Sequence, residues 1–392
     1  MILFEEVNKI VNESIIKQKK TETVKLVDSL NRILAQDVIS DVDMPPFDKS
    51  AMDGYACKKE DIKNELEVIE IIPAGKEPEK IIRHNQCSKI MTGAKIPKGA
   101  DCVLMVEHTI ETGKNKIKFT KEDTNSNICS KAEDVKSGQT VLTKGIRIQP
   151  KHIGTFASVG CTNPLVYKKL DVGIITTGDE LVEPNLKPGL SQIRNSNAYQ
   201  LITQVKNVGA NPNYLGIVKD NEEETYNIIC KALEKNDLVL LTGGVSMGDY
   251  DFVVDTLKKA GLKILFDSVA VQPGRPTTFG VAKGKACFGL PGNPVSSFVQ
   301  FELLIKPYIL KSMGYNYKPV TIKMPLGVDY KRKKSKRKSF IPVYINDKGM
   351  VMPVDYHGSA HIHSYVAAQG MISINIGETI IKKGEIVDVR QI

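Results

Sequence analysis

Between Leu170 and Leu310 the sequence alternates between short apolar runs and segments with helical spacing. The apolar runs are VGIITTG, YLGIVKD, LVLLTGG and ACFGLPG. Helical patterns lie between these runs, from about Asn195 to Val208 and from about Glu222 to Lys235. A long helical stretch follows the last run and ends at Leu310. Such alternation indicates βαβ units, in which parallel strands form one sheet with helices on both faces. The sequence therefore predicts a doubly wound α/β domain.

A glycine-rich loop, LTGGVSMGDYD, follows the third apolar run and leads into another helical pattern. Glycine lets the backbone turn sharply and bring its amides close to a ligand, and amides at a helix start bind phosphate. Asp249 and Asp251 could hold a divalent cation against that phosphate. A tight turn that only permits strand–helix packing is the alternative, and it loses ground because a second loop of this kind, TTGDE, occurs upstream. The glycines concerned are Gly243, Gly244 and Gly248.

Four loops are expected to meet at the carboxyl ends of the strands, where doubly wound sheets bind their ligands. Several carboxylates beside two glycine loops suit a phosphate bridged by Mg²⁺, which takes one or two carboxylates plus phosphate oxygens. A helix cap is the alternative for any single acid, and it is the favoured interpretation of Asp179 alone. The polar, glycine and proline residues of these loops include Asp179, Glu180, Asp220, Pro291, Gly292, Asn293, Pro294 and Ser296.

Two further motifs could contact the same anion. PGRP, Pro273 to Pro276, joins two strands, and Arg275 either faces the anion or is a surface hairpin arginine, with equal weight. His361 and His363 of HGSAHIHS are expected on one face of a strand as a possible metal pair. Without a third ligand, ordinary packing or anion contact is the favoured interpretation of these histidines.

The N-terminal half has a different character. Helical spacing is predicted through Phe4, Val7, Val11 and Ile15, and again through Leu26, Leu30, Ile33 and Leu34. Pro45 and Pro46 then break the pattern, in a turn-rich segment where Ser50 and Asp53 are expected to be exposed. A β-rich stretch follows, in which Thr92 and Gly93 could offer a hydroxyl and an amide to an oxyanion, although a simple turn is the favoured interpretation of this motif alone. Helical spacing returns from Gln149 to Val159.

Charge and cysteine content limit the remaining options. The formal net charge of the 392 residues is +9, but the run KRKKSKRK at Lys331 to Lys338 supplies seven of these charges. A solvated hairpin tip is favoured over a nucleic-acid site for this run. The seven cysteines contain no C-x-x-C pair, so neither a disulfide framework nor a zinc site is indicated. The acidic N-terminus and the lack of a long apolar run predict a cytoplasmic protein.

The motifs PPFDKSAMDGYA, IMTGAKIPKGAD, TTGDEL, LTGGVSMGDYD, QPGRP and LPGNPVS together resemble the molybdopterin molybdenumtransferases, the MoeA-like family that includes the E domain of gephyrin. The resemblance runs along the whole chain. It implies a multidomain α/β protein with a doubly wound, MogA-like domain at 170–316. The other parts would be an elongated helical domain at 1–44 and 140–169, an inserted β-rich domain at 45–139, and a C-terminal β-barrel at 317–392.

The resemblance also implies an activity and a set of site residues. Enzymes of this family insert molybdate into adenylylated molybdopterin and release AMP with Mg²⁺ present. The implied catalytic residues are Asp53, Thr92, Glu180, Asp220 and Asp251; Glu180 and Asp251 would hold the metal, and a second subunit would bring Asp53 and Thr92. The implied substrate-binding residues are Thr177, Gly178, Gly243, Gly244, Ser246, Gly248, Pro273, Gly274, Arg275, Pro291, Gly292, Asn293, Pro294 and Ser296.

The chain departs from this family at Cys129, Ser268 and Gln272, where several relatives carry basic residues. Fewer fixed cations would weaken or relocate an oxyanion pocket. Tungstate as the substrate and a paralogue of reduced activity therefore remain alternatives. A scaffolding module is a further alternative because of the likeness to gephyrin and the basic run, and adenylylation of molybdopterin is another because that enzyme shares a doubly wound domain of this type. Expected partners are a second copy of the chain, a molybdopterin adenylyltransferase and the molybdenum enzymes that accept the cofactor.

Overall fold

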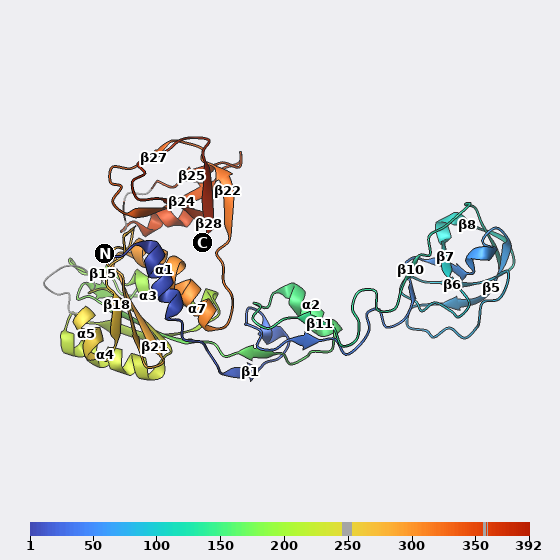
Figure 1. Cartoon of the computed structure of the whole chain (residues 1–392), viewed down its shortest axis with the longest axis horizontal. Coiled ribbons are helices and arrows are strands. Elements are labelled where there is room, and N and C mark those ends of the chain that lie inside the picture. Colours follow the sequence, from blue (N-terminus) through green and yellow to red (C-terminus); the bar gives the residue numbers. More distant parts are fainter. Residues whose placement is uncertain (245–252, 356–357, 359) are drawn as a thin grey trace.

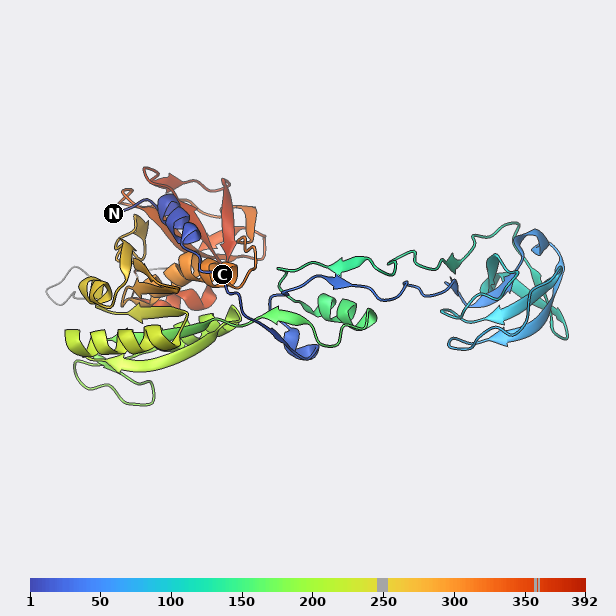
Figure 2. The ribbon, with the colours of Figure 1, turned by 60° about the horizontal axis from the view of Figure 1, so that its bottom comes forward.

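The protein is elongated, with a large body at one end and a small β domain at the other (Figures 1 and 2). A computed structural model describes residues 1–244, 253–355, 358 and 360–392. The body contains the central sheet and the C-terminal domain, and a narrow middle segment connects it to the distal β domain (Figure 1). None of the described helices is both long enough and apolar enough to cross a membrane.

The predicted doubly wound sheet is present. It has six strands in the order β16-β13-β17-β21-β20-β18. The first four pair in parallel, whereas β20 pairs antiparallel with both of its neighbours, β21 and β18. The carboxyl ends of the four parallel strands therefore meet at one edge of the sheet. The strands are β13 (Asp171–Thr177), β16 (Asn211–Val218), β17 (Leu238–Thr242), β18 (Lys263–Phe266), β20 (Thr278–Ala282) and β21 (Lys285–Leu290).

Helices cover both faces of this sheet, because the strands are apolar on both sides. Leu201 and Val205 of one helix and Val295 and Val299 of another pack with Leu240 in one core. A second core on the opposite face is smaller and includes buried residues of α4 and α5. The helices are α3 (Ser196–Asn207), α4 (Glu222–Lys235), α5 (Val253–Lys259), α6 (Pro294–Gln300), the π-helical turn η4 (Phe301–Ile305) and α7 (Lys306–Ser312).

The N-terminal helix α1 (Phe4–Glu13) packs on the body, because Phe4, Val7 and Val11 belong to the larger core of the sheet. The ring of Phe4 also meets that of Phe340 edge-on, with 5.2 Å between centroids. The helix therefore joins the sheet to the C-terminal domain, which supplies Phe340.

The second helical pattern of the N-terminal half, through Leu26 to Leu34, does not form an α-helix. A single 3₁₀ turn, η1 (Val27–Ser29), forms there, and Asn31 with φ 64° turns the chain away. Ile33 and Leu34 are instead buried by isolated β-bridges to Arg147 and Val166. Contacts distant in sequence thus override the local spacing of these apolar residues. The helix predicted from Gln149 to Val159 is confirmed as α2 (Pro150–Ser158).

The middle segment consists of two chain stretches that pair as short antiparallel strands and share a small core with α2. Its strands are β1 (Thr21–Thr23), β2 (Val38–Ile39), β11 (Thr140–Leu142) and β12 (Leu165–Tyr167). The distal β domain beyond it has a six-stranded sheet in the order β7-β4-β6-β5-β9-β8. Its elements are β3 (Lys49–Ser50), β4 (Gly54–Cys57), η2 (Lys59–Asp61), β5 (Glu65–Ile72), β6 (Gln86–Ile90), β7 (Cys102–Met105), η3 (Val106–His108), β8 (Thr109–Gly113), β9 (Lys116–Phe119) and β10 (Ile128–Cys129).

The C-terminal domain is built from a second mixed sheet with its own apolar core. The sequence predicts His361 and His363 on a strand, and this prediction is wrong. His361 directly precedes the 3₁₀ helix η5, and His363 lies within it. They therefore do not share a strand face. The elements are β19 (Val271–Gln272), β22 (Thr321–Pro325), β23 (Tyr330–Lys331), β24 (Lys338–Ile345), β25 (Val351–Pro353), η5 (Ile362–Ala367), β26 (Gly370–Ile374), β27 (Ile380–Ile381) and β28 (Ile386–Gln391).

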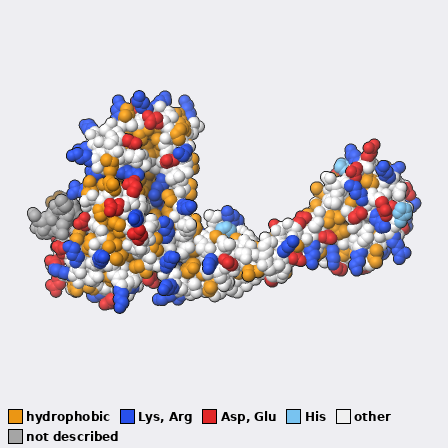
Figure 3. All heavy atoms as spheres, viewed as in Figure 1, with side chains coloured by type: hydrophobic (Ala, Val, Ile, Leu, Met, Phe, Trp, Pro, Cys, Tyr) orange, Lys and Arg blue, Asp and Glu red, His pale blue; other side chains and the backbone are white. Residues whose placement is uncertain are grey.

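The basic run Lys331 to Lys338 is not the hairpin tip that the sequence favours. It connects β23, which pairs with β27, to β24, which pairs with β26 in a different sheet. Arg332 is half-buried and donates hydrogen bonds to the carbonyls of Glu378 and Arg337, so part of the run is structural. Lysine and arginine side chains are also spread over the outer surface of this domain on the face shown in Figure 3.

Candidate functional site

A cavity of about 600 Å³ lies at the carboxyl edge of the parallel strands, where the sequence predicts the site. We call it the carboxylate cavity, because Glu180 and Asp220 both line it. Loops after β13, β16, β17 and β21 contribute, together with the start of α3 and part of the C-terminal domain. The predicted site residues that line it are Thr177, Gly178, Glu180, Asp220, Gly243, Gly244, Pro291, Gly292, Asn293 and Pro294.

The loop after β13 folds the carboxylate of Glu180 back over Gly178. A Cβ atom at Gly178 would lie 2.4 Å from Oε2 of Glu180, and the φ of this residue is +148°, so glycine is required here. The N–H of Gly178 donates to the carbonyl of Val218 at 3.2 Å, which ties this loop to the end of β16. Short parallel pairing of β14 (Leu181–Val182) with β15 (Ile193–Arg194) fixes its far side. The Glu180 carboxylate is therefore held at the cavity wall.

Asp220 follows β16 and lies beside Asp179. Its backbone N–H donates to Oδ1 of Asp179 at 3.3 Å. Burial, and secondly the negative charge of Asp179, raise the pKa of Asp220 above its ordinary value. A cation placed next to Asp220 would counter both effects and favour the ionised carboxylate.

The glycine loop after β17 touches both neighbouring loops. A Cβ at Gly243 would lie 2.3 Å from the carbonyl oxygen of Thr177, and its φ of +98° also requires glycine. The N–H of Gly243 donates to the carbonyl of Leu290 at 3.2 Å, and a Cβ at Gly292 would lie 3.9 Å from the Cα of Gly243. Backbone therefore packs on backbone here, which leaves room for a ligand beside the loops.

Asn197, at the start of α3, is a site residue that sequence reasoning missed. Its side chain is 9% exposed, and its Nδ2 donates to Oγ1 of Thr242 at 3.0 Å and to the carbonyl of Gly292 at 2.6 Å. It thereby joins the loops that end β17 and β21. No pattern in the sequence reveals it, because these partners lie 45 and 95 residues away.

We expect Asn197→Asp to lower both stability and turnover. The substitution keeps the size of the side chain but removes the Nδ2 donor, so the carbonyl of Gly292 and Oγ1 of Thr242 lose their partner. The expected loss is about 1–3 kcal/mol in the free energy of unfolding, and about tenfold or more in turnover because the two loops shift. Denaturant unfolding and steady-state rates measure these effects. Thr203→Ala, on the exposed side of the same helix, is the control; equal effects in both variants would contradict a positioning role for Asn197.

Other residues that sequence reasoning did not single out also line the carboxylate cavity. Most belong to the segment before α3 or to the C-terminal domain, and the run QIRNSN could have indicated the first group, because buried asparagines at a helix start need partners. His363, considered in the sequence as an anion contact, lines the cavity from η5. The additional lining residues are Leu181, Ile193, Arg194, Asn195, Ser196, Pro276, Ala360, Ile362 and His363.

Several predicted site residues lie elsewhere. Asp53 and Thr92 are together in the distal β domain, where the N–H and Oγ1 of Thr92 donate to Oδ1 of Asp53 at 2.7 and 3.1 Å. That domain is far from the carboxylate cavity of the same chain (Figures 1 and 2). Ser296 is buried in α6, and Pro273 and Gly274 lie in the segment after β19 without lining the cavity. Ser246, Gly248, Asp249 and Asp251 fall outside the described residues.

Arg275 lines a neighbouring cavity of about 530 Å³, which we call the cationic cavity. Pro276, the next residue, lines the carboxylate cavity, so the two cavities share the PGRP segment. Every charged side chain among the described residues that line the cationic cavity is positive. They are Arg275, Lys333, Lys334, Lys336 and Arg337. An anion would be attracted to this cavity.

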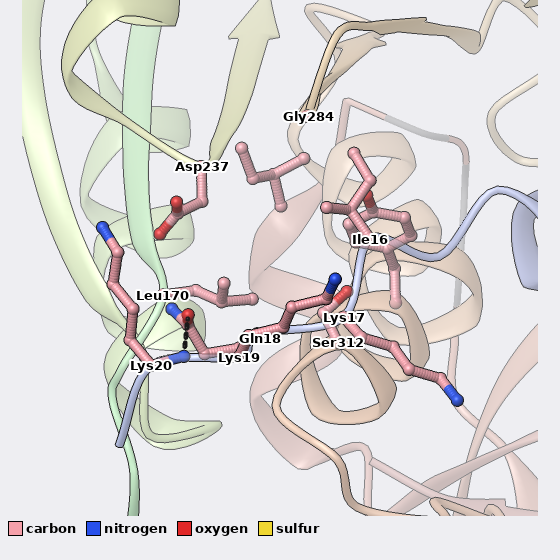
Figure 4. Close-up of a pocket in the computed structure, with 11 residues that line it drawn as sticks. Ile16, Lys17, Gln18, Lys19, Lys20, Leu170, Asp237, Gly284 and Ser312 are labelled. Carbon is pink, nitrogen blue, oxygen red and sulfur yellow. Dashed lines mark hydrogen bonds between the residues drawn. The ribbon is translucent and has the colours of Figure 1, made fainter. Parts of the chain in front are cut away.

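A third cavity, of about 310 Å³, lies at the opposite edge of the sheet (Figure 4). Segment 16–20 lines it, as do Asp237, which precedes β17, and Ser312 at the end of α7. Asp237 is the single carboxylate among the described residues that line it, and its Oδ2 already accepts the N–H of Asp171 at 3.0 Å. This cavity therefore lacks the carboxylate pair that metal-assisted chemistry needs.

The carboxylate cavity combines the start of α3 with two acidic side chains. The helix start favours a phosphate, whereas the carboxylates would repel it unless a cation lay between them. The arrangement is suited to a metal-bridged phosphate ester or diphosphate, beside a second anion held by the cationic cavity.

Comparison with known proteins agrees with this organisation. Residues 2–160 match the family described as "MoeA N-terminal region (domain I and II)", residues 173–311 match "Probable molybdopterin binding domain", and residues 323–392 match "MoeA C-terminal region (domain IV)". The chain is 39% identical over 385 residues to the molybdopterin molybdenumtransferase of Staphylococcus epidermidis, covering 94% of this chain and 91% of that protein. It is 42% identical over 306 residues to the Bacillus subtilis enzyme, covering 75% and 71%.

A solved structure is similar over the full length. The crystal structure of a molybdopterin biosynthesis MoeA protein from Pyrococcus horikoshii superposes with a TM-score of 0.87 and 30% sequence identity, and the match covers 100% of both chains. The similarity therefore extends from the body to the distal β domain.

Proposed function

The chain belongs to the MoeA family of molybdopterin molybdenumtransferases, and we propose that it inserts molybdate into adenylylated molybdopterin with Mg²⁺-dependent release of AMP. Its role in molybdenum cofactor biosynthesis follows from family membership. The observation that supports the finer proposal is the convergence of Glu180, Asp220 and two glycine loops on one cavity. A cytoplasmic location is part of the proposal, and the seven free cysteines fit a reducing compartment.

The residues of the carboxylate cavity fit a divalent cation, because Glu180 and Asp220 both line it and Mg²⁺ prefers carboxylate oxygens as ligands. Glu180 and Asp220 would hold Mg²⁺, and Asp251 of the loop after β17 would complete the set. When bound, Mg²⁺ neutralises charge on the diphosphate as the phosphoanhydride breaks. The helix start of α3, which lines the cavity, would orient the phosphates. The hydrogen bonds of Asn197 to the loops after β17 and β21 would keep the site residues in position.

Molybdate is the second substrate, and the cationic cavity is the place we assign to it. Gln272 lines this cavity without a charge, but five lysine and arginine side chains compensate for the missing cation. The shared PGRP segment would bring the oxyanion close to the dithiolene of a pterin bound in the carboxylate cavity, whose soft sulfurs capture the metal. Tungstate has the same charge and a similar shape, so it competes for the same cavity.

The position of Asp53 and Thr92 supports a homodimer with shared sites. Their hydrogen bonds hold them as a rigid pair on the distal β domain, away from the cavity of their own chain. In a dimer of the family type, one protomer would place this pair at the cavity of its partner. A molybdopterin adenylyltransferase would supply the substrate, and molybdenum enzymes would accept the product.

A defined reaction tests the proposal. The protein is incubated with adenylylated molybdopterin, Mg²⁺ and either molybdate or tungstate, and AMP and finished cofactor are measured together. We expect both products to appear in step and to require Mg²⁺. Adenylylated product from ATP and molybdopterin alone would instead indicate the adenylyltransferase reaction. A protein that makes neither product, but keeps a stable partner complex after charge reversal of Glu180 and Asp220, would be a scaffold.

We expect Arg275→Gln to raise the KM for molybdate by about tenfold, since a charge-assisted contact to a divalent oxyanion is lost. The affinity for adenylylated molybdopterin should change much less, because Arg275 does not line the carboxylate cavity. Steady-state kinetics with each substrate varied in turn measures both constants. Lys348→Gln, which changes an exposed lysine of the C-terminal domain that does not line the cationic cavity, is the control. An unchanged KM in Arg275→Gln would contradict our placement of molybdate.

A further inference from the structure

The distal β domain brings three potential metal ligands together, far from the carboxylate cavity. They are Glu60, Asp61 and His84, and one ligand atom of each lies within 4.8 Å of the other two. Within the described ranges this is the one group of three or more acidic, histidine or cysteine side chains with such spacing. Glu60 and Asp61 belong to η2, and His84 belongs to the loop before β6.

Asp61 is the member of this cluster that the surrounding fold holds in place. Its side chain is fully buried, and its Oδ2 accepts the backbone N–H of Asn85 at 2.9 Å. Nδ1 of His84 lies 2.7 Å from the other oxygen, Oδ1, yet Oδ1 accepts no correctly directed hydrogen bond from any residue that the structure describes. A buried carboxylate oxygen faces an imidazole nitrogen without an N–H aimed at it. A cation beside these two atoms, either a proton on the imidazole or a metal ion, would satisfy Oδ1.

The other two ligands are accessible and adjustable. The side chain of His84 is 69% exposed, and that of Glu60 is 66% exposed. Glu60 meets Lys58 in an ion pair of 3.2 Å, but an exposed pair of this kind contributes little and is easily broken. Ligands of one zinc ion lie about 2.0–2.2 Å from the metal, hence roughly 3–4 Å from each other. A shared metal ion would need Nδ1 of His84 and Oδ1 of Asp61 to move apart from 2.7 Å and Glu60 to turn inward, and the exposed side chains of His84 and Glu60 leave room for both adjustments.

We propose that Glu60, Asp61 and His84 bind a divalent transition cation of the Zn²⁺ type. One imidazole with two carboxylates suits such an ion better than Mg²⁺, which prefers oxygen ligands alone. Three protein ligands leave a coordination position for water. The ion would fasten η2 to the loop before β6, next to the hydrogen bond between Asn64 and Asn85. Its role is structural and is independent of the reaction proposed for the carboxylate cavity.

The full-length protein, freed of any histidine tag, tests this site with Co²⁺ and Zn²⁺. We expect Co²⁺ to bind in a 1:1 ratio with weak visible bands of nitrogen and oxygen ligation, and Zn²⁺ to displace it. Hydrogen exchange of the backbone should slow in residues 58–67 and 81–90 when Zn²⁺ is present. An intense sulfur-to-cobalt band would show that buried cysteines bind the ion, and would overturn the proposal.

Substitutions distinguish zinc binding at this site from zinc binding elsewhere in the protein. His84→Gln and Glu60→Gln change exposed side chains and should fold normally while lowering the affinity for Zn²⁺ by more than about tenfold. Asp61→Asn should abolish binding. His108→Gln, in the same domain, is the matched control and should bind as the unmodified protein does. Equal affinity in His84→Gln and His108→Gln, or no binding of either ion at micromolar concentration, would leave Asp61 and His84 as a plain ion pair and refute the metal site.

Discussion

Replacing Asp220 with Asn is expected to reduce AMP release by about a thousandfold or more while leaving the free protein slightly more stable. The loss of rate follows from removing a carboxylate that we assign to the metal in the carboxylate cavity. The gain in stability follows from the raised pKa of Asp220, which means that ionising this group in the folded protein is unfavourable. The two effects together are typical of a site residue whose charge serves function rather than folding.

The stability gained in Asp220→Asn should depend on pH in a defined direction. Above the folded-state pKa of Asp220, the unmodified protein carries the full free-energy cost of the buried charge. This cost declines as pH falls through the folded-state pKa and is absent below the unfolded-state pKa, where the group is protonated in both states. Asp220→Asn should therefore raise Tm by about 1–2 °C at neutral pH and by less in acid.

The matched control is Asp179→Asn, which removes a neighbouring charge and keeps an oxygen to accept the N–H of Asp220. Asp179 does not line the carboxylate cavity, so its replacement should change turnover only modestly. Initial rates and thermal unfolding at several pH values measure both variants. Unchanged turnover in Asp220→Asn would remove this carboxylate from the proposed reaction.

Mixing two inactive variants is expected to restore activity. Asp220→Asn damages the carboxylate cavity, and Asp53→Asn damages the distal pair while keeping the oxygen that accepts from Thr92. If two chains exchange freely, half of the dimers contain one of each variant, and each mixed dimer has one intact site of two. The mixture should therefore reach about a quarter of the unmodified activity, measured after co-refolding or subunit exchange.

A second mixture is the control. Asp220→Asn with Glu180→Gln should remain inactive, because both residues line the cavity of a single chain and every site in the mixed dimer is damaged. Equal activity in the two mixtures would contradict shared sites. Restoration in neither mixture would indicate that Asp53 acts elsewhere, or that the chains do not associate.

Much of the fold of the body could be predicted, because the sequence patterns that indicate it involve residues close together along the chain. Alternation of apolar runs and helical spacing gave the parallel strands and the helices α3 and α4. Positions such as Gly178 and Gly243 adopt backbone conformations that other residues rarely reach, so their glycines marked the loops of the carboxylate cavity. The parallel order of the strands then placed Glu180 and Asp220 at one edge.

The failures share a cause, which is that contacts between distant residues decide the outcome. Asn197 is recognisable only through its hydrogen bonds to Thr242 and Gly292. Leu34 has helical spacing but is buried by a bridge to Val166. His363 was expected on a strand, whereas its segment folds as a 3₁₀ helix against the carboxylate cavity. Local patterns carry no information about such partners.

The narrow middle segment has a mechanical consequence. Because the middle segment is narrow and pairs through short strands such as β1 and β12, a slight rotation there would displace Asp53 and Thr92 by a much larger distance. In the proposed dimer the segment would act as a lever arm, and its stiffness would set how accurately one protomer positions Asp53 and Thr92 at the cavity of its partner. Substitutions that soften it would impair the reaction from a distance, without altering any group that meets the substrates.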